Sequence, residues 1–347
     1  MKIAMVSEDD GPGRWDVHAA DLAAALVALG HEVTVHTCPE AAATTPGQEP
    51  YLGDFVDSLR SEWAHARPDV VHAHHWQPGL AALLAVRPAG VPVVQSFHGF
   101  GRRPDVERLV GREAAVVVAG CEDELLRLAA AGVPRPRMVV VPRGVDVELF
   151  QPQGEPARRR VKRIVARAGD GVEDVVAALP WLPDAELLIT GPFPADEAKR
   201  LGRRARELGV HERIRSAGPV AHENLPALLR SADVVACVPR QPVWDAWPLE
   251  AMACGVAVVA TSVSGLTDAV TDGVTGVLVP PGEVKTLVKN LRVVLEDATL
   301  RTSCGIAAVD RVQARHTWPD VARGLERLYR RVLEPPAVVK RGRRVAG

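Results

Sequence analysis

Residues 248–281 read PLEAMACGVAVVATSVSGLTDAVTDGVTGVLVPP, and they indicate how the second half of the chain folds. Pro248 suits the first position of a helix, and Glu250 then lies in the first turn, where the helix dipole favours an acid. Gly255 suits the residue that ends this helix. Residues 257–260 form a short apolar run of the kind found in buried parallel strands. The stretch therefore predicts a helix followed by a strand of an open α/β sheet.

Two parts of this stretch are expected at the edge of the sheet where ligands bind. Open α/β sheets bind their ligands outside the carboxyl ends of the strands. The loop 262–268 follows the strand and contains Ser264 and Gly265, so these two residues are candidates for ligand binding. The carboxylate of Glu250 can accept two hydrogen bonds from a vicinal diol such as a ribose. A surface acid that only stabilises its helix remains the alternative for Glu250.

Short apolar runs alternate with amphipathic stretches along the whole chain, as they do in the βαβ units that build a parallel sheet. In the first half we expect strands at residues 2–6, 32–36, 70–73, 92–96, 114–119 and 138–141. In the second half we expect strands at residues 163–166, 185–190, 213–217, 234–238, 257–260 and 276–279. A chain of 347 residues is long enough for two domains. The pattern therefore predicts an α/β protein with two doubly wound parallel sheets.

The domain boundary is expected in residues 151–160, which are polar, contain Pro and Gly and show no periodicity. Residues 1–150 and 161–316 would then form two Rossmann-like domains. Residues 317–334 carry apolar side chains at helical spacing, and we expect this helix to pack back on the N-terminal domain. The basic residues 335–347 are expected to form a flexible tail, with an interaction arm as the alternative.

The composition excludes several classes of protein. Lys and Arg (42 residues) balance Asp and Glu (43 residues), so the chain lacks the basic footprint of a nucleic-acid-binding protein. Acidic residues begin at Glu8, too early for the apolar core of a signal peptide, and no apolar run is long enough to cross a membrane. The five cysteines are scattered and lack the spacing of metal ligands, so we expect free thiols. These features predict a cytoplasmic protein without a transmembrane segment.

Seven segments together resemble the retaining GT-B glycosyltransferases of glycosyltransferase family 4. In chain order they are MKIAMVSE, GHEVTVHT, PDVVHAHHWQPGLAALLA, VPVVQSFHGFG, VPRGVDVELF, SADVVACVP and DGVTGVLVPP. Each segment alone is a weak signal, but seven in the family's order are specific. The resemblance covers residues 1–333 and is greatest to members that build actinobacterial thiols and related glycosides, a sucrose-synthase-like group. It implies the GT-B fold, in which an N-terminal acceptor-side domain and a C-terminal nucleotide-sugar-binding domain, both Rossmann-like, face a central cleft.

The resemblance also implies roles for individual residues. Glu250 matches the glutamate that holds the ribose, and Arg167 matches the arginine that faces the diphosphate. His98 of the FHGFG segment matches the histidine beside the donor sugar, so these three are the candidate catalytic residues. Gly13 matches the first glycine of a loop whose backbone N–H groups approach the phosphates. The alternatives are a packed strand-end histidine for His98, a surface cation for Arg167 and an ordinary turn for Gly13.

Several positions near the expected donor site depart from the family pattern. Pro242 replaces a glutamate that binds the donor sugar, and Trp244 and Asp245 replace the phenylalanine and glycine that follow it. Asp170 replaces a lysine, so an anion stands where the family neutralises the diphosphate. Arg14 replaces the second glycine of the N-terminal loop, where it either blocks the backbone or supplies a cation to the donor. Asp245 is a further candidate for a contact with a sugar hydroxyl. These changes fit either a changed donor or a lost activity.

The resemblance implies transfer of a sugar from a nucleotide-diphosphate-sugar, with a UDP-sugar as the expected donor, to a hydroxyl of a small acceptor, with retention at the anomeric carbon. No metal or other cofactor is expected, because helix ends and cations neutralise the leaving diphosphate in this fold. His72 and His74 share a strand face, but their segment matches a strand-end loop of the family and not a metal site. The alternative is a catalytically degenerate relative that binds a nucleotide or a partner protein. The sequence leaves homodimer formation open.

Overall fold

The computed structural model describes residues 1–8, 16–38, 52–99, 101, 103–158, 161–242 and 246–334. The chain divides into two compact units. The first unit contains Met1–Ser96, Asp105–Val118 and the segment from Ala322 onward, and the second contains Phe97–Pro104 and Ala119–Val321. The domain boundaries expected from the sequence stay a prediction.

The first sheet has six strands in the order β2-β1-β3-β4-β5-β6. Its strands are β1 (Lys2–Glu8), β2 (Glu32–Cys38), β3 (Val70–His74), β4 (Val93–Ser96), β5 (Val116–Ala119) and β6 (Met138–Val140). Neighbouring strands among β1 to β5 are parallel. The connecting helices are α1 (Asp16–Ala28), α2 (Leu52–His65), α3 (Trp76–Val86), α4 (Pro104–Glu113) and α5 (Glu122–Ala130). Alternating strands and helices thus give the doubly wound arrangement.

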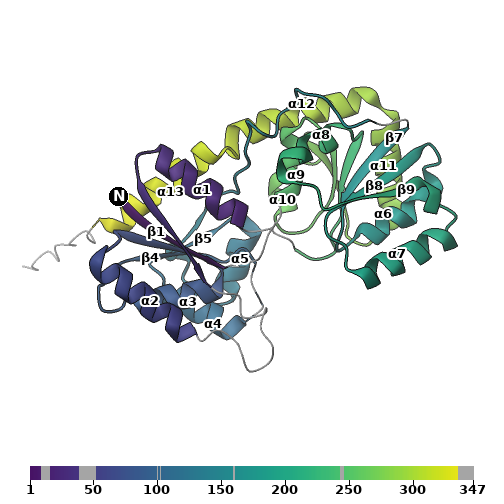
Figure 1. Cartoon of the computed structure of the whole chain (residues 1–347). Helices are drawn as coiled ribbons and strands as arrows, with labels where there is room; N and C mark the ends of the chain where they lie inside the picture. The colour runs from purple at the N-terminus through teal and green to yellow at the C-terminus, as the bar shows by residue number, and fades with distance from the viewer. Residues whose placement is uncertain are drawn as a thin grey trace, which may run out of the picture. The chain divides into compact units, whose positions relative to one another are not determined.

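Helices cover both faces of the first sheet (Figure 1). On one face, Val56, Leu59 and Trp63 of α2 pack together with α3 on buried residues of β1 and β3. The other face carries α1 and α13 (Trp318–Leu333), the last helix of the chain. Strands β3, β4 and β5 are buried along their whole length, whereas the edge strand β2 is partly exposed. Burial on both faces explains why the inner strands are almost continuously apolar in the sequence.

A buried polar contact joins α13 to the first sheet. Nδ1 of His72 on β3 lies 2.6 Å from the Tyr329 hydroxyl of α13, and Nε2 lies 2.9 Å from the Ser96 hydroxyl of β4. The ring of His74 stacks on that of His72, with centroids 4.4 Å apart. Burial lowers the pKa of His72 to about 3, so the ring is neutral and both nitrogens have hydroxyl partners. The His72 contact therefore fastens α13 to the sheet. Among the described residues, no three His, Cys, Asp or Glu side chains gather as a metal site.

The second sheet also has six strands, in the order β12-β11-β10-β7-β8-β9, and its neighbouring strands are parallel. Its strands are β7 (Lys162–Arg167), β8 (Ala185–Thr190), β9 (Ile214–Gly218), β10 (Val234–Cys237), β11 (Val258–Thr261) and β12 (Gly276–Val279). The helices before α13 are α6 (Val172–Ala178), α7 (Ala195–Glu207), α8 (Leu225–Arg230), α9 (Trp247–Ala253), α10 (Leu266–Ala269), α11 (Val284–Glu296) and α12 (Ala298–Arg315). Short 3₁₀ helices occur at Arg135–Arg137, Leu179–Trp181, His211–Arg213 and His222–Asn224.

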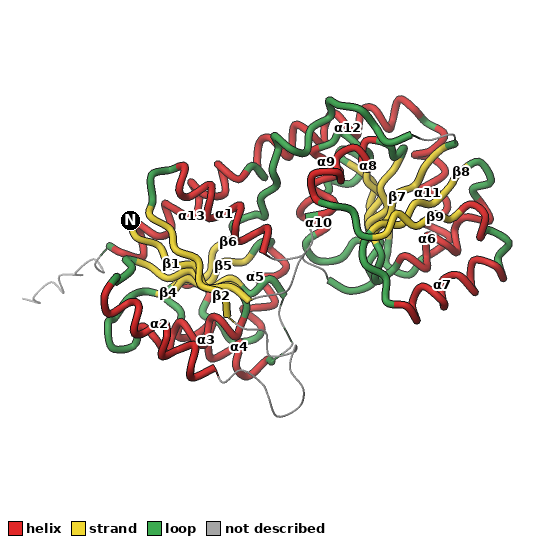
Figure 2. The backbone as a smooth tube through the Cα atoms, viewed as in Figure 1, coloured by secondary structure: helices red, strands yellow, loops and turns green. Residues whose placement is uncertain are grey.

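Two apolar clusters cover the two faces of the second sheet. Helices α6, α7 and α11 pack on one face, with Val175, Leu201 and Leu291 among the buried residues. Helices α8, α9, α10 and α12 pack on the other face, with Met252 and Val312 among the buried residues. Figure 2 shows the strands of this sheet, in yellow, between the red helices. The unit is therefore a three-layer α/β/α sandwich.

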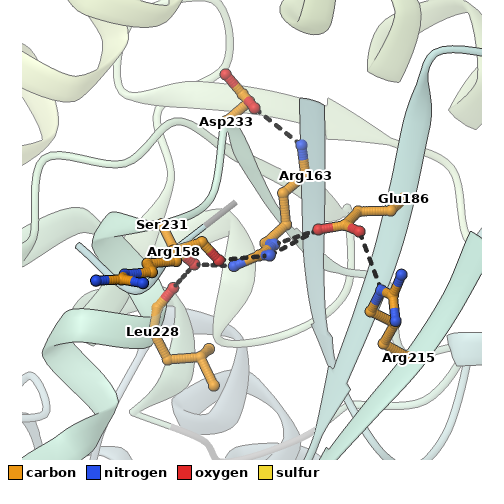
Figure 3. A network of polar contacts seen from close by, with 7 residues as sticks. All are labelled: Arg158, Arg163, Glu186, Arg215, Leu228, Ser231 and Asp233. Atoms are coloured by element: carbon orange, nitrogen blue, oxygen red, sulfur yellow. Dashed lines mark hydrogen bonds and ion pairs between the residues drawn. The ribbon is translucent and has the colours of Figure 1, made fainter. Parts of the chain in front are cut away.

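A buried ion pair joins the amino ends of the strands in this unit (Figure 3). Arg163 at the start of β7 donates from Nε to Oε1 of Glu186 at 2.7 Å and from Nη1 to the Ser231 hydroxyl at 2.9 Å. The second carboxylate oxygen of Glu186 accepts from Nε of Arg215 at 3.3 Å, and Asp233 accepts the backbone N–H of Arg163 at 2.8 Å. Each buried charge thus has a partner, as burial requires. This network lies at the opposite end of the strands from the ligand-binding edge, and we assign it to the fold.

The expected fold class is confirmed, because the chain contains two parallel six-stranded sheets with helices on both faces. All twelve expected strands are present, and their ends agree with the observed ones to within two residues. Helix α9 begins at Trp247, so Pro248 and Glu250 both lie in its first turn, as predicted. Among the described residues, the structure contains no helix that is long and apolar enough to span a bilayer.

Candidate functional site

The carboxyl ends of β7 and β10 meet at a turn that only glycine permits. The turn between β7 and α6 contains Gly169 and Gly171, with φ angles of 133° and 86°. A Cβ atom on Gly171 would overlap the backbone carbonyl of Val238, the residue that follows β10. The missing side chain therefore lets the turn after β7 lie directly against the chain that leaves β10. Thr261 at the end of β11 donates its hydroxyl to the carbonyl of Pro239 at 2.6 Å and holds the same loop from the other side.

Asp170 lies in this turn and holds the loop that follows β10. Its Oδ2 accepts the backbone N–H groups of Arg240 at 2.7 Å and Gln241 at 3.0 Å. The sequence suggested an anion that opposes a diphosphate, but the carboxylate has two backbone donors. Asp170 therefore has a structural role in this chain.

Arg240 is a cation near the expected donor site that the sequence analysis missed. Its Nη2 and Nε donate to the two carboxylate oxygens of Asp174 at 2.6 and 3.1 Å. Asp174 is 7% exposed and Arg240 is 48% exposed, so the guanidinium pairs with a buried acid and still faces water. The hydrogen bonds that Arg240 donates to the Asp174 carboxylate raise the pKa of Arg240 above its ordinary value. No local sequence motif indicates this pair, because Asp174 in the first turn of α6 and Arg240 in the loop after β10 are 66 positions apart.

Arg167 and Glu250 both lie at the carboxyl edge of the second sheet. Arg167 is the last residue of β7, and Glu250 lies in the first turn of α9, which follows the central strand β10. The Glu250 side chain is largely buried, with 7% of the residue exposed. The two residues therefore stand on adjacent strand-to-helix connections, β7 to α6 and β10 to α9, at the edge where ligands of such sheets bind. The alternative of an exposed helix-stabilising acid does not fit Glu250, because its side chain is buried.

Ser264 and Gly265 lie in the loop between β11 and α10. Gly265 adopts a φ of 85° and precedes the first residue of α10. The Ser264 hydroxyl lies 3.6 Å from Sγ of Cys121, which caps the start of α5. Gly265 also lines a pocket of about 330 Å³ together with Arg311 and His316. Both loop residues thus lie at the strand edge, as expected.

His98 lies in a turn of unusual backbone geometry directly after β4. Its φ is 51°, in the left-handed region that residues with a side chain rarely adopt, and that of Gly99 is 129°. Phe97, just before it, is almost completely buried and anchors the turn. Left-handed backbone outside glycine is often found at functional sites, where the surroundings hold it in place.

Of the remaining predicted positions, the structure describes Pro242 but not the other four. Pro242 is exposed at the end of the loop that Asp170 holds. Gly13, Arg14, Trp244 and Asp245 lie outside the described residues, so their expected roles stay predictions.

Glu124 is a second residue that the sequence analysis missed. It is the third residue of α5, 4% exposed, and its Oε2 accepts the backbone N–H of Gly120 at 2.8 Å. Burial raises the pKa of Glu124 to about 7, although the N–H groups of Gly120 and Gly99 and the charge of Arg127 act in the opposite direction. A capping residue followed three positions later by glutamate is a known sequence signal, and Cys121–Glu124 is a variant of it.

Comparison with known proteins agrees with this architecture. The family model Glycosyltransferase Family 4 matches residues 16–149, and the model Glycosyl transferases group 1 matches residues 148–311. The D-inositol 3-phosphate glycosyltransferase of Frankia alni is 31% identical over an alignment that covers 94% of this chain and 96% of the relative. The D-inositol 3-phosphate glycosyltransferase 1 of Catenulispora acidiphila is 30% identical, with 82% of this chain and 76% of the relative covered.

Solved structures share the fold at lower sequence identity. Sucrose-phosphate synthase from Thermosynechococcus elongatus superposes with a TM-score of 0.81 at 23% identity, covering 96% of this chain and 99% of the other. Anabaena HepE, solved in complex with UDP and glucose, superposes with a TM-score of 0.81 at 20% identity, covering 95% and 100%. With the two family models and the relatives of at least 30% identity, these likenesses show that the chain belongs to glycosyltransferase family 4 and is a glycosyltransferase with the GT-B fold.

Proposed function

We propose that the chain transfers a sugar from a UDP-sugar to a hydroxyl of a small acceptor and that the anomeric configuration is retained. The bond between the anomeric carbon and the diphosphate oxygen breaks, and the acceptor oxygen bonds to the same face of that carbon. The acceptor proton passes to the departing phosphate oxygen, so the reaction needs no nucleophile from the protein. The protein contributes positioning and charge stabilisation.

The observation that carries this proposal is the position of Glu250. The side chain is buried in the first turn of α9, at the carboxyl edge of the second sheet. In the proposed complex its carboxylate accepts hydrogen bonds from both ribose hydroxyls. HepE, which shares the fold, has been solved with UDP-glucose, and this supports a UDP-sugar as the first donor to test.

In this proposal Arg167 and His98 lie beside the diphosphate and the sugar of the donor. Arg167 at the end of β7 faces the diphosphate and offsets the charge that grows on the leaving group. His98, held in its left-handed turn, lies beside the sugar. Cations of the protein neutralise the leaving group, so the proposed reaction uses no metal.

The acceptor is proposed from the relatives. The Frankia alni and Catenulispora acidiphila proteins are named D-inositol 3-phosphate glycosyltransferases, so D-inositol 3-phosphate is the first acceptor to assay. A catalytically degenerate protein is not favoured, because the family relationship extends over 94% of the chain.

The test is a transfer assay with UDP-glucose and UDP-N-acetylglucosamine as donors and D-inositol 3-phosphate or free inositol as acceptor. We expect a glycoside whose proton NMR coupling shows the anomeric configuration of the donor, and loss of product in Glu250→Gln. Glu296→Gln is the matched control, since Glu296 is an exposed acid at the end of α11. An inverted product would refute retention, and release of free sugar or no reaction with any UDP-sugar would refute the proposed transfer.

A further inference from the structure

A pocket of about 330 Å³ lies at the end of α12 and is lined by basic side chains. Arg311 and Arg315 come from the last two turns of this helix. His316 directly follows the helix, and Arg143 lies in the segment after β6. The starts of α5 and α9 and the helix α10 form the other walls. Every described residue that lines the pocket belongs to the second unit. The volume lies at the lower end of the range of roughly 300–1,000 Å³ that is usual for small-molecule sites.

Backbone carbonyls hold the guanidinium of Arg311 in place. Its Nε donates to the carbonyl of Ala269 at 2.8 Å and its Nη2 donates to that of Asp268, so Arg311 closes the end of α10. Among the described residues Arg311 forms no ion pair, although the Asp268 carboxylate lies near enough to favour its charge. Burial and the charge of Arg315 act in the opposite direction and lower the pKa of Arg311. The carbonyls therefore fix this cation without neutralising it, and Nη1 is left to donate to a ligand.

Arg315 is an exposed cation one turn further along α12. Residues four positions apart on a helix are neighbours, so the charges of Arg311 and Arg315 repel each other. Within the described part of the chain, the Arg315 side chain has neither a hydrogen bond nor an ion pair. An anion bound between the two guanidinium groups would remove the repulsion and accept their hydrogen bonds.

His316 and two acids complete the polar wall of the pocket. Nδ1 of His316 lies 3.0 Å from the carbonyl oxygen of Arg143 and donates to it, because a carbonyl oxygen only accepts. This hydrogen bond fixes the backbone of Arg143 at the pocket wall. The acids are Glu122, the first residue of α5, and Asp268. The described lining thus combines three arginines with two carboxylates, which fits a ligand that carries both an anionic group and hydroxyls.

We propose that this pocket binds a phosphorylated small molecule, with the phosphate between Arg311 and Arg315. Guanidinium groups match the oxygens of a phosphate, which carries a charge of about −1.5 to −2 at pH 7. Asp268 lines the same pocket and accepts hydrogen bonds from hydroxyls of the ligand. Glu250 and Arg167, proposed for the donor, are not among the described residues that line this pocket. The inference therefore goes beyond the proposed function, and binding to the pocket can be measured without sugar transfer.

The binding test is calorimetric titration of D-inositol 3-phosphate into the full chain in a buffer without phosphate. We expect saturable binding to the wild type and binding about 10- to 100-fold weaker to Arg315→Gln, because a hydrogen bond between charged groups is lost. Inorganic phosphate should compete with D-inositol 3-phosphate, and saturating UDP should not displace it.

Arg206→Gln is the matched control for the binding test and should bind like the wild type. Arg206 is also an exposed arginine in the last turn of a helix of the second unit, and it does not line the pocket. Equal affinity of the wild type and Arg315→Gln would overturn the inference. So would displacement by UDP, or a wild type that binds neither D-inositol 3-phosphate nor inorganic phosphate.

A phosphorylated acceptor and a phosphorylated effector carry the same group, and the transfer assay separates them. If the pocket holds the phosphate of the acceptor, inorganic phosphate and Arg315→Gln both raise the KM for D-inositol 3-phosphate and leave that for free inositol unchanged. If it holds an effector, inorganic phosphate changes the rate of transfer to free inositol, and Arg315→Gln abolishes this change.

The two proposals fail in different ways. If the wild type transfers no sugar but binds both phosphates through Arg315, the proposed function fails and the pocket stands. If it transfers sugar while both phosphates bind equally to the wild type and Arg315→Gln, the inference on the pocket fails alone.

Discussion

Oδ2 of Asp170 accepts the backbone N–H of Arg240 at 2.7 Å, so Asp170 holds the loop after β10 in place. The same oxygen accepts the N–H of Gln241 at 3.0 Å. The charge of Asp170 is thereby met by backbone donors. The loop leads to Pro242, which directly follows Gln241 and was also expected from the sequence to differ from the family pattern.

Asp170→Lys should therefore loosen this loop instead of restoring a family site. We expect faster hydrogen exchange of the Arg240 and Gln241 amides and a loss of about 1 kcal/mol of stability, the usual net value of a hydrogen bond. Asp170→Asn keeps a carbonyl acceptor, so the Arg240 and Gln241 amides should exchange nearly as slowly in this variant as in the wild type. Tighter donor binding in Asp170→Lys, with exchange of the loop unchanged, would show that the carboxylate only obstructs the donor.

Gly171→Ala should destabilise the second unit by about 3 kcal/mol, because the added methyl overlaps the Val238 carbonyl and the φ of 86° disfavours a side chain. Gly169→Ala is the matched control. Gly169 also has a positive φ, but no atom lies within 4 Å of the position its Cβ would take, so only about 1 kcal/mol of backbone strain is expected. Urea unfolding of the two variants measures the difference. Equal losses of unfolding free energy in the two variants would mean that the overlap with the Val238 carbonyl does not destabilise Gly171→Ala.

His72 should make the first unit sensitive to acid. Its pKa in the folded chain is about 3, below the ordinary 6.5, so between these values the unfolded chain binds a proton that the folded chain does not. This contribution to stability is complete above pH 6.5 and is lost as the pH falls toward 3, at about 1.4 kcal/mol per pH unit.

The measurement for His72 is urea unfolding between pH 4 and 7. As the pH falls, the free energy of unfolding should decrease more steeply in the wild type than in His72→Gln. The glutamine amide keeps hydrogen-bonding capacity and does not titrate. His65→Gln, at an exposed position of α2, should follow the wild type. Parallel curves for the wild type and His72→Gln would contradict a buried neutral His72.

The strands could be predicted from the sequence because burial on both faces of a parallel sheet leaves short apolar runs with little ambiguity. Glu250 could be placed because Pro248 marks the start of its helix. Helix α2 was not predicted, although Val56, Leu59 and Trp63 recur at helical spacing. The Asp170 and Arg240 contacts had no local signal, since their partners are brought together only by the sheet.

Calorimetric titration of UDP-sugars into the wild type and Glu250→Gln tests the central claim most directly, because it measures the ribose contact without requiring the correct acceptor. We predict saturable binding of at least one UDP-sugar to the wild type and binding about 10- to 100-fold weaker to Glu250→Gln, since hydrogen bonds to a charged acceptor contribute about 1.5–3 kcal/mol. Glu296→Gln should bind like the wild type. Equal affinity in Glu250→Gln, or no binding of any UDP-sugar to the wild type, would contradict the donor site described here.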